Sequence, residues 1–114
     1  MKILVAGGRD YDNEELVNKV LDNLNPKPTC VVQGGAFGAD RLAFWWALKN
    51  KIPQKTYTAK WKEHKNAAGP IRNALMLSEN KDIELAILFP GGAGTDDMRQ
   101  KLIKKNIKIL EITE

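Results

Sequence analysis

The stretch Lys2-Ile3-Leu4-Val5-Ala6-Gly7-Gly8-Arg9-Asp10 decides the fold: an apolar run of strand length ends directly in two glycines and a charged pair. The pattern returns where Thr29 to Gln33 meets Gly34-Gly35, and again where Glu84 to Phe89 meets Pro90-Gly91-Gly92. Nearly continuous Val, Ile, Leu and Ala are typical of strands buried on both faces of a parallel sheet. Each of these strands is followed by glycine and then by a segment of helical period.

Five strands are predicted in all, and segments with apolar residues at helical spacing separate them. The strands are expected at Lys2 to Ala6, Thr29 to Gln33, Gln54 to Ala59, Glu84 to Phe89 and Ile107 to Ile112. The helices are expected at about Asn13 to Leu24, Ala39 to Asn50, Pro70 to Glu79, and from a cap at Thr95 or Asp96 onward. In the first helix, Asp12 with Glu15 resembles a capping box.

The connections between the strands limit the topology, because crossovers between parallel strands are right-handed. A central first strand, with the chain reversing direction around it, gives the order 3-2-1-4-5. The predicted fold class is therefore α/β: a three-layer Rossmann-like fold with a five-stranded parallel sheet and helices on both faces. Ligands of such sheets bind outside the carboxyl ends of the strands, in the crevice between strands one and four.

Length and composition fit one domain spanning residues 1–114. Hydrophobic residues make up 43% of the chain and charged residues 28%, which suits a core that needs neither disulfides nor a structural metal. Cys30 is the only cysteine, so a disulfide framework and a cysteine-rich metal site are excluded. No apolar run approaches about 18 residues and no signal peptide is seen, so a cytoplasmic location without membrane contact is expected. The net charge of +4 suits an anionic ligand.

Eight of the nine glycines lie in three turns, each at the carboxyl end of a strand expected to be buried. Glycine permits positive φ and lets backbone N–H groups approach an anion, while the following helix N-terminus adds partial positive charge. One such turn alone could simply be tight, but three at one sheet edge predict an anion-binding pocket. The expected ligand-binding residues are Gly7, Gly8, Arg9, Gly34, Gly35, Gly38, Asp40, Arg72, Gly91, Gly92, Gly94 and Thr95.

Two arginines adjoin these turns and are candidates to hold a phosphate, since an arginine fork suits that group. Arg72 lies just inside a helix that opens with Gly69-Pro70, and Arg9 follows the first glycine pair. The plainer interpretation of Arg72 is a surface salt bridge of little energetic weight. Asp10 and Asp40 could hydrogen-bond a ribose hydroxyl or merely fix their own loops.

The three tryptophans lie in two segments, and the role of each segment has more than one interpretation. The segment Lys60 to Asn66 places Trp61 and His64 among basic residues, and either stacking on a base or a solvated loop with one anchored ring accounts for it. His64 is the only histidine, so no histidine-based metal site is expected. Trp45 and Trp46 are neighbours on a helix and cannot face the same way, so one is expected in the core and the other is free for a subunit contact.

The motifs together resemble the SLOG superfamily, specifically its small YpsA-related branch, over nearly the whole chain. The resemblance rests on Gly7-Gly8-Arg9-Asp10-Tyr11, Gln33-Gly34-Gly35-Ala36, Gly38-Ala39-Asp40, Ala68-Gly69-Pro70-Ile71-Arg72-Asn73 and Phe89-Pro90-Gly91-Gly92-Ala93-Gly94-Thr95. It implies a Rossmann-like fold that binds nucleotides or nucleotide-derived ligands, in proteins often linked to phage and to bacterial conflict systems. A homodimer is a further expectation from this resemblance.

A more distant resemblance is to the LONELY GUY-type phosphoribohydrolases, which cleave the N-glycosidic bond of a nucleoside monophosphate. Pro90 to Thr95 matches their Pro-Gly-Gly-x-Gly-Thr loop, and Arg72 to Met76 resembles their Arg-Lys-x-x-Met motif with asparagine in place of lysine. Met98, however, stands where they carry a glutamate. Such a reaction needs a carboxylate to stabilise oxocarbenium charge or to activate water. Asp96 and Asp97 are the catalytic candidates, although each could only favour the first helical turn.

Three functional hypotheses follow. The first is binding or sensing of a phosphorylated nucleotide-derived small molecule, with no cofactor required. The second is a nucleoside-phosphate N-glycosidase that uses Asp96 or Asp97. The third is a single-stranded nucleic-acid-binding module, because another SLOG branch, the DNA-processing proteins, handles single strands through this fold. Met98 at the glutamate position favours holding a phosphorylated ligand over cleaving it.

Overall fold

The computed structural model describes residues 1–114, and its five strands form one parallel sheet in the order β3-β2-β1-β4-β5. The strands are β1 (Lys2–Ala6), β2 (Cys30–Gln33), β3 (Gln54–Thr56), β4 (Ile83–Leu88) and β5 (Ile109–Glu111). The helices are α1 (Glu14–Asp22), α2 (Ala39–Lys49), α3 (Trp61–His64), the 3-10 turn η1 (Lys65–Ala67), α4 (Ala68–Glu79) and α5 (Ala93–Lys104). The predicted fold class and strand order are confirmed. No helix combines the length and apolar character that crossing a membrane requires.

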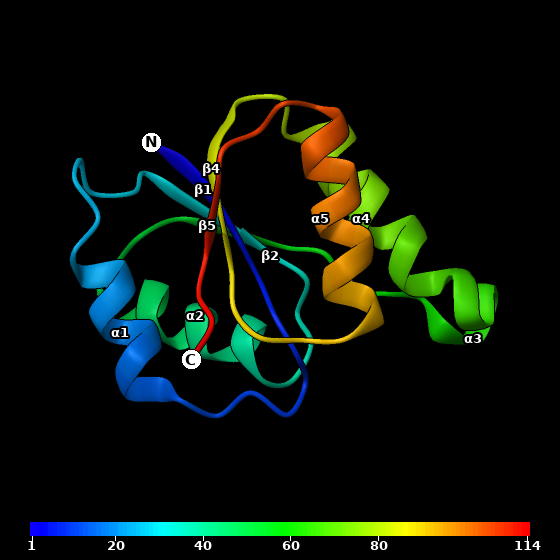
Figure 1. The fold of residues 1–114 in the computed structure, drawn as a ribbon, viewed down its shortest axis with the longest axis horizontal. Coiled ribbons are helices and arrows are strands. Elements are labelled where there is room, and N and C mark those ends of the chain that lie inside the picture. Colours follow the sequence, from blue (N-terminus) through cyan, green and yellow to red (C-terminus); the bar gives the residue numbers. More distant parts are fainter.

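Helices cover both faces of the sheet, with α1 and α2 on one side and α4 and α5 on the other (Figure 1). Side chains alternate along a strand, so β1 serves two cores. Ile3 and Val5 pack with Trp46 on the side of α1 and α2, whereas Leu4 packs with Met76 on the side of α4 and α5. Burial on both faces explains why the central strands are almost entirely apolar.

Two helix starts differ from the sequence prediction. The cap of α1 is Asn13, whose side chain accepts a hydrogen bond from the backbone N–H of Leu16 at 3.1 Å, so the predicted capping box at Asp12 is wrong. Helix α5 begins at Ala93, which places Thr95 and Asp96 inside the first turn. Its N-cap is therefore a glycine, and no side chain caps the helix.

The segment after β3 contains more structure than the sequence indicated. Strand β3 ends at Thr56, three residues before the predicted Ala59. Helix α3 and η1 then lead directly into α4, and α3 lies at the N-terminal end of that helix (Figure 1). A helix of four residues is too short to show helical periodicity, so pattern reasoning had no signal for it. Its position brings Trp61 to the carboxyl edge of the sheet.

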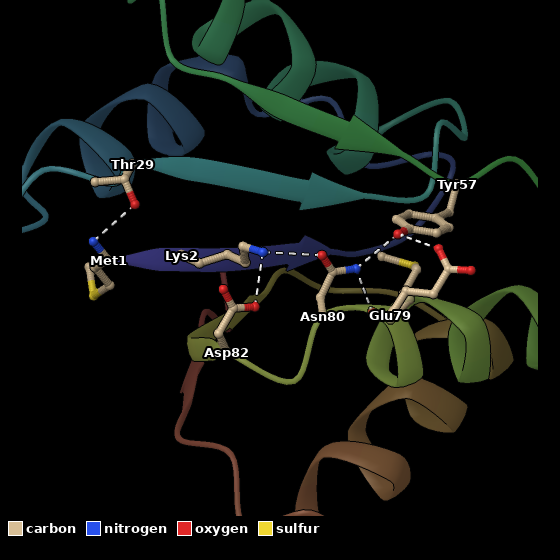
Figure 2. Close-up of polar contacts among 8 residues, drawn as sticks. Met1, Lys2, Thr29, Tyr57, Glu79, Asn80 and Asp82 are labelled. Carbon is tan, nitrogen blue, oxygen red and sulfur yellow. Dashed lines mark hydrogen bonds and ion pairs between the residues drawn. The ribbon is translucent and has the colours of Figure 1, made fainter.

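A chain of polar side chains fastens the C-terminal end of α4 to the sheet (Figure 2). The buried Asn80 amide donates to the carbonyl oxygen of Met76 at 2.8 Å and to the Tyr57 hydroxyl at 3.0 Å. The Asn80 carbonyl accepts from Nζ of Lys2 at 3.3 Å, and the same Nζ lies 2.9 Å from Asp82. Helix α4 is thus anchored at one end by these bonds, which positions Arg72 near its other end.

Candidate functional site

A cavity of about 430 Å³ opens beyond the carboxyl end of β1, where the strand order reverses. The starts of α2, α4 and α5 and the three glycine turns contribute to its wall. The lining residues are Val5, Ala6, Gly7, Gly8, Arg9, Gly34, Ala36, Asp40, Trp61, Gly69, Arg72, Asn73, Met76, Gly92, Ala93, Gly94, Thr95 and Met98. Of the twelve residues expected to bind ligand, Gly35, Gly38 and Gly91 do not line this cavity. The other nine come together there.

Gly38 and Gly91 are needed to let the turns approach one another. Gly38 has φ of +82°, and a Cβ there would collide with the carbonyl oxygen of Gly8. A Cβ on Gly91 would collide with the Thr95 hydroxyl and lie 2.7 Å from the Gly8 nitrogen. The first and third turns are also joined directly, because the Gly8 N–H donates to the Pro90 carbonyl at 2.8 Å. Gly38 and Gly91 therefore affect the shape of the cavity without lining it, because they allow the turns to pack closely.

The N-terminus of α5 presents unused hydrogen-bond donors to the cavity. The first helical bond runs from the Asp96 N–H to the Gly92 carbonyl at 3.0 Å, and the N–H groups of Ala93, Gly94 and Thr95 have no acceptor within the protein. Nothing lies within 4 Å of the positions that a Cβ would take on Gly92 or Gly94. Free N–H groups at a helix start, with the positive end of the helix dipole behind them, form a site suited to an anion.

Arg72 lines the cavity, and hydrogen bonds within the protein hold its side chain in one conformation. Its Nη1 donates to the Gly34 carbonyl at 2.7 Å and to the Tyr57 carbonyl at 3.4 Å, and its Nε donates to Oδ1 of Asn73 at 2.9 Å. Nη2 makes no hydrogen bond within the protein, so its two N–H groups remain for a ligand. Burial lowers the pKa of Arg72, and the nearby Asp40 carboxylate opposes that lowering. The guanidinium stays charged, because an arginine side chain remains protonated at physiological pH even when burial lowers its pKa.

Asp40 is the buried acid of the cavity wall, with only 5% of its surface exposed. Its Oδ2 accepts from the Ala36 N–H at 3.4 Å, while Oδ1 has no hydrogen-bond partner. Burial raises the pKa of Asp40 to about 6, although the positive charge of Arg72 and the hydrogen bond from Ala36 act to lower it. This carboxyl group can therefore change its charge near neutral pH.

Asn73 connects α4 to the start of α5, a role that its place as asparagine instead of lysine in the motif did not predict. Its amide donates to the Gly94 carbonyl at 3.1 Å and to Oδ2 of Asp97 at 3.1 Å, while its oxygen accepts from Arg72. The side chain is 3% exposed and holds α4 against the start of α5. The position of Asn73 next to Arg72 in the motif was the one feature of the sequence that could have indicated a role in the site. Its hydrogen bond to the Gly94 backbone carbonyl could not be predicted, because a carbonyl acceptor does not depend on residue type.

The two candidate catalytic carboxylates lie outside the cavity wall, whereas Met98 forms part of it. Asp96 is paired with Arg99, and Asp97 lies 2.7 Å from Nζ of Lys101. Burial acts to raise the pKa of Asp97, but the hydrogen bonds from Lys101 and Asn73 and the charges of Lys101 and Arg72 together outweigh it, so the pKa falls below its usual value. A catalytic role for Asp96 or Asp97 stays a prediction. No three His, Cys, Asp or Glu side chains gather in a way that could hold a metal ion.

Arg9 and Trp61 meet at the mouth of the cavity. The Arg9 guanidinium lies 4.7 Å from the centroid of the Trp61 ring, a cation–π distance, and Trp61 is 46% exposed. The adjacent pair on α2 divides as predicted: Trp46 is buried and its indole N–H donates to Asp22 at 2.8 Å, whereas Trp45 is exposed. The subunit contact suggested for the exposed ring stays a prediction.

The sequence and the fold were compared with those of known proteins. The model of the YspA, cpYpsA-related SLOG family matches residues 1–64, more than half of the chain. The Gene 61 protein of Mycobacterium phage D29 is 28% identical over 117 residues, which cover 96% of this chain and 94% of that protein.

Among solved structures, DNA processing protein A from Streptococcus pneumoniae resembles the chain with a TM-score of 0.80 at 17% sequence identity. The match covers 99% of this chain and 50% of that protein, so the chain spans about half the length of the DNA processing protein. At this level of identity the likeness is one of fold, and it agrees with the Rossmann-like sheet described above.

Proposed function

Because this chain belongs to the YspA, cpYpsA-related SLOG family, we propose that it binds a phosphorylated, nucleotide-derived small molecule in the cavity at the carboxyl edge of its sheet. One observation carries the proposal: α5 starts in the cavity with three free N–H groups and no capping side chain. A bound phosphate would supply the acceptors that these donors lack, and the helix dipole would favour its negative charge.

The charged side chains of the wall support an anionic ligand with hydroxyl groups. Nη2 of Arg72 adds two donors. Asn73 and Gly34 already hold the guanidinium in place, so binding a ligand would cost little side-chain conformational entropy. Oδ1 of Asp40 is buried and lacks a donor, and a small shift of this side chain toward the cavity would let a sugar hydroxyl donate to it. A phosphate beside a hydroxylated sugar satisfies both needs within one small molecule.

The variant Gly94→Asp tests the proposal without damaging the fold. A Cβ at this position meets no atom within 4 Å, and an acidic side chain in the first turn favours a helix. We expect the free energy of unfolding to stay unchanged or rise by about 0.5–1 kcal/mol. Affinity for nucleoside phosphates, measured by isothermal titration calorimetry, should fall at least about tenfold because the new charge repels phosphate.

Gly94→Ala is the matched control, since it fills the same space without charge and should keep nearly the original affinity. A nucleotide that binds the wild type and Gly94→Asp equally well would refute a phosphate site at α5. Failure of nucleoside mono- and diphosphates and of ADP-ribose derivatives to stabilise the wild type against heat would remove the proposed function itself.

A second candidate function is binding of single-stranded nucleic acid; the DNA processing protein that shares this fold is named for a role on DNA. The observation that favours it is a pair of exposed aromatic rings, Trp61 and Phe37, each with an arginine against its face. The same variant separates the two functions. A strand held by these outer rings would bind Gly94→Asp nearly as well as wild type, with an affinity that falls steeply as salt rises.

A further inference from the structure

A second cavity, of about 290 Å³, adjoins the first along the β2–α2 loop. The two cavities share five lining residues, so they lie next to each other on either side of the same side chains. These residues are Arg9, Gly34, Ala36, Trp61 and Arg72. A ligand whose phosphate occupies the start of α5 would extend past these shared residues to reach the second cavity.

The second cavity differs from the first in its chemistry. Two large aromatic rings line it, Phe37 from the β2–α2 loop and Trp61 from α3, and they are 63% and 46% exposed. Arg41 lies 4.1 Å from the Phe37 ring centroid, as Arg9 does at 4.7 Å from that of Trp61. No side-chain carboxylate lines this cavity. Exposed rings with arginines on their faces suit a flat, electron-rich aromatic group, which stacks on both kinds of partner.

We propose that the second cavity binds the nucleobase of the ligand, so that the protein recognises nucleoside phosphates rather than sugar phosphates that carry no base. This inference rests on the proposed function, because the phosphate site at α5 sets which end of the ligand enters the second cavity. Trp61 is the main stacking surface, since it borders both cavities, and Phe37 lines only the second. Stacking depends little on which base is present, so both purine and pyrimidine bases fit this recognition.

The test compares two ligands that differ only in the base: AMP and ribose 5-phosphate. Calorimetric titration of the wild type should give tighter binding of AMP. In Trp61→Ala the affinity for AMP should fall about tenfold, as removing a stacking ring does, while the affinity for ribose 5-phosphate should change little. Phe37→Ala should act in the same direction. The matched control is Trp45→Ala, which removes a tryptophan of similar exposure, 55% against 46%, from outside both cavities.

Two outcomes would overturn the inference, and a third would fall on the proposed function instead. If Trp61→Ala and Phe37→Ala both bind AMP as the wild type does, no base stacks on either ring. If Trp61→Ala weakens AMP and ribose 5-phosphate by the same factor, Trp61 acts on the phosphate through Arg9 and does not read the base. If the wild type binds neither compound, the phosphate site itself is absent. Thermal unfolding of each variant confirms that the compared proteins are folded.

Discussion

At the scale of single residues, Asp40 is the group whose environment most affects its chemistry. It is buried in the cavity wall, one carboxylate oxygen has no partner, and its pKa is raised to about 6. The native protein therefore holds this proton more tightly than the unfolded chain, in which the carboxyl keeps its ordinary pKa of 3.8. Ionisation of Asp40 accordingly removes stability as pH rises from about 4 to about 6.

Asp40→Asn should abolish this contribution. Relative to the wild type, the free energy of unfolding of the variant should rise between pH 4 and pH 7 by up to about 3 kcal/mol, the equivalent of roughly two pKa units. Urea unfolding of both proteins across this range measures the difference, and other carboxylates cancel because both proteins carry them. A difference that stays constant with pH would mean that Asp40 titrates normally.

Single residues also mark the limit of what the sequence predicted. Glycines at the ends of apolar runs identified the turns, because the backbone requirement for glycine is local. The role of Asn73 depends on how α4 lies against the start of α5, and the charge that opposes the raised pKa of Asp40 comes from Arg72 on another helix. Contacts between elements distant in the chain do not follow from residue type and spacing.

At the scale of elements, the start of α5 is the place where the predicted helix cap was wrong and where we propose that phosphate binds. The sequence offered Thr95 and Asp96 as caps, and the helix instead begins at Ala93 with free N–H groups. An N-cap side chain would occupy the donors that a ligand could use. An uncapped helix start beside a cavity is therefore consistent with a binding role, whereas α1, none of whose residues lines either cavity, carries the side-chain cap of Asn13.

The anchor of α4 gives a prediction for element stability. Asn80 is 1% exposed, and its amide group bonds to the chain at three points, including the last turn of α4. Asn80→Ala should lower the free energy of unfolding by about 1–3 kcal/mol, because it leaves buried polar partners unsatisfied. The control is Asn66→Ala, at an exposed position in η1 without a side-chain hydrogen bond. Equal losses in the two variants, measured by denaturant unfolding, would show that the anchor contributes nothing.

At the scale of the whole molecule, alternating strand and helix patterns were enough to predict the sheet. Crossover handedness then fixed the strand order, and the order placed the cavity between β1 and β4. Short elements escaped this reasoning. Helix α3 has four residues and no helical period. It nevertheless places Trp61 where this side chain lines both cavities.

The central claim is that phosphate of a nucleotide-derived ligand binds the free N–H groups at the start of α5. The most direct measurement is a titration of ¹⁵N-labelled protein with AMP, followed by amide chemical shifts. The account predicts that the amide signals of Ala93, Gly94 and Thr95 move first and furthest, together with the Nε–H of Arg72, and that Gly94→Asp removes these changes. Saturable AMP binding that leaves the three amide signals in place would contradict the account.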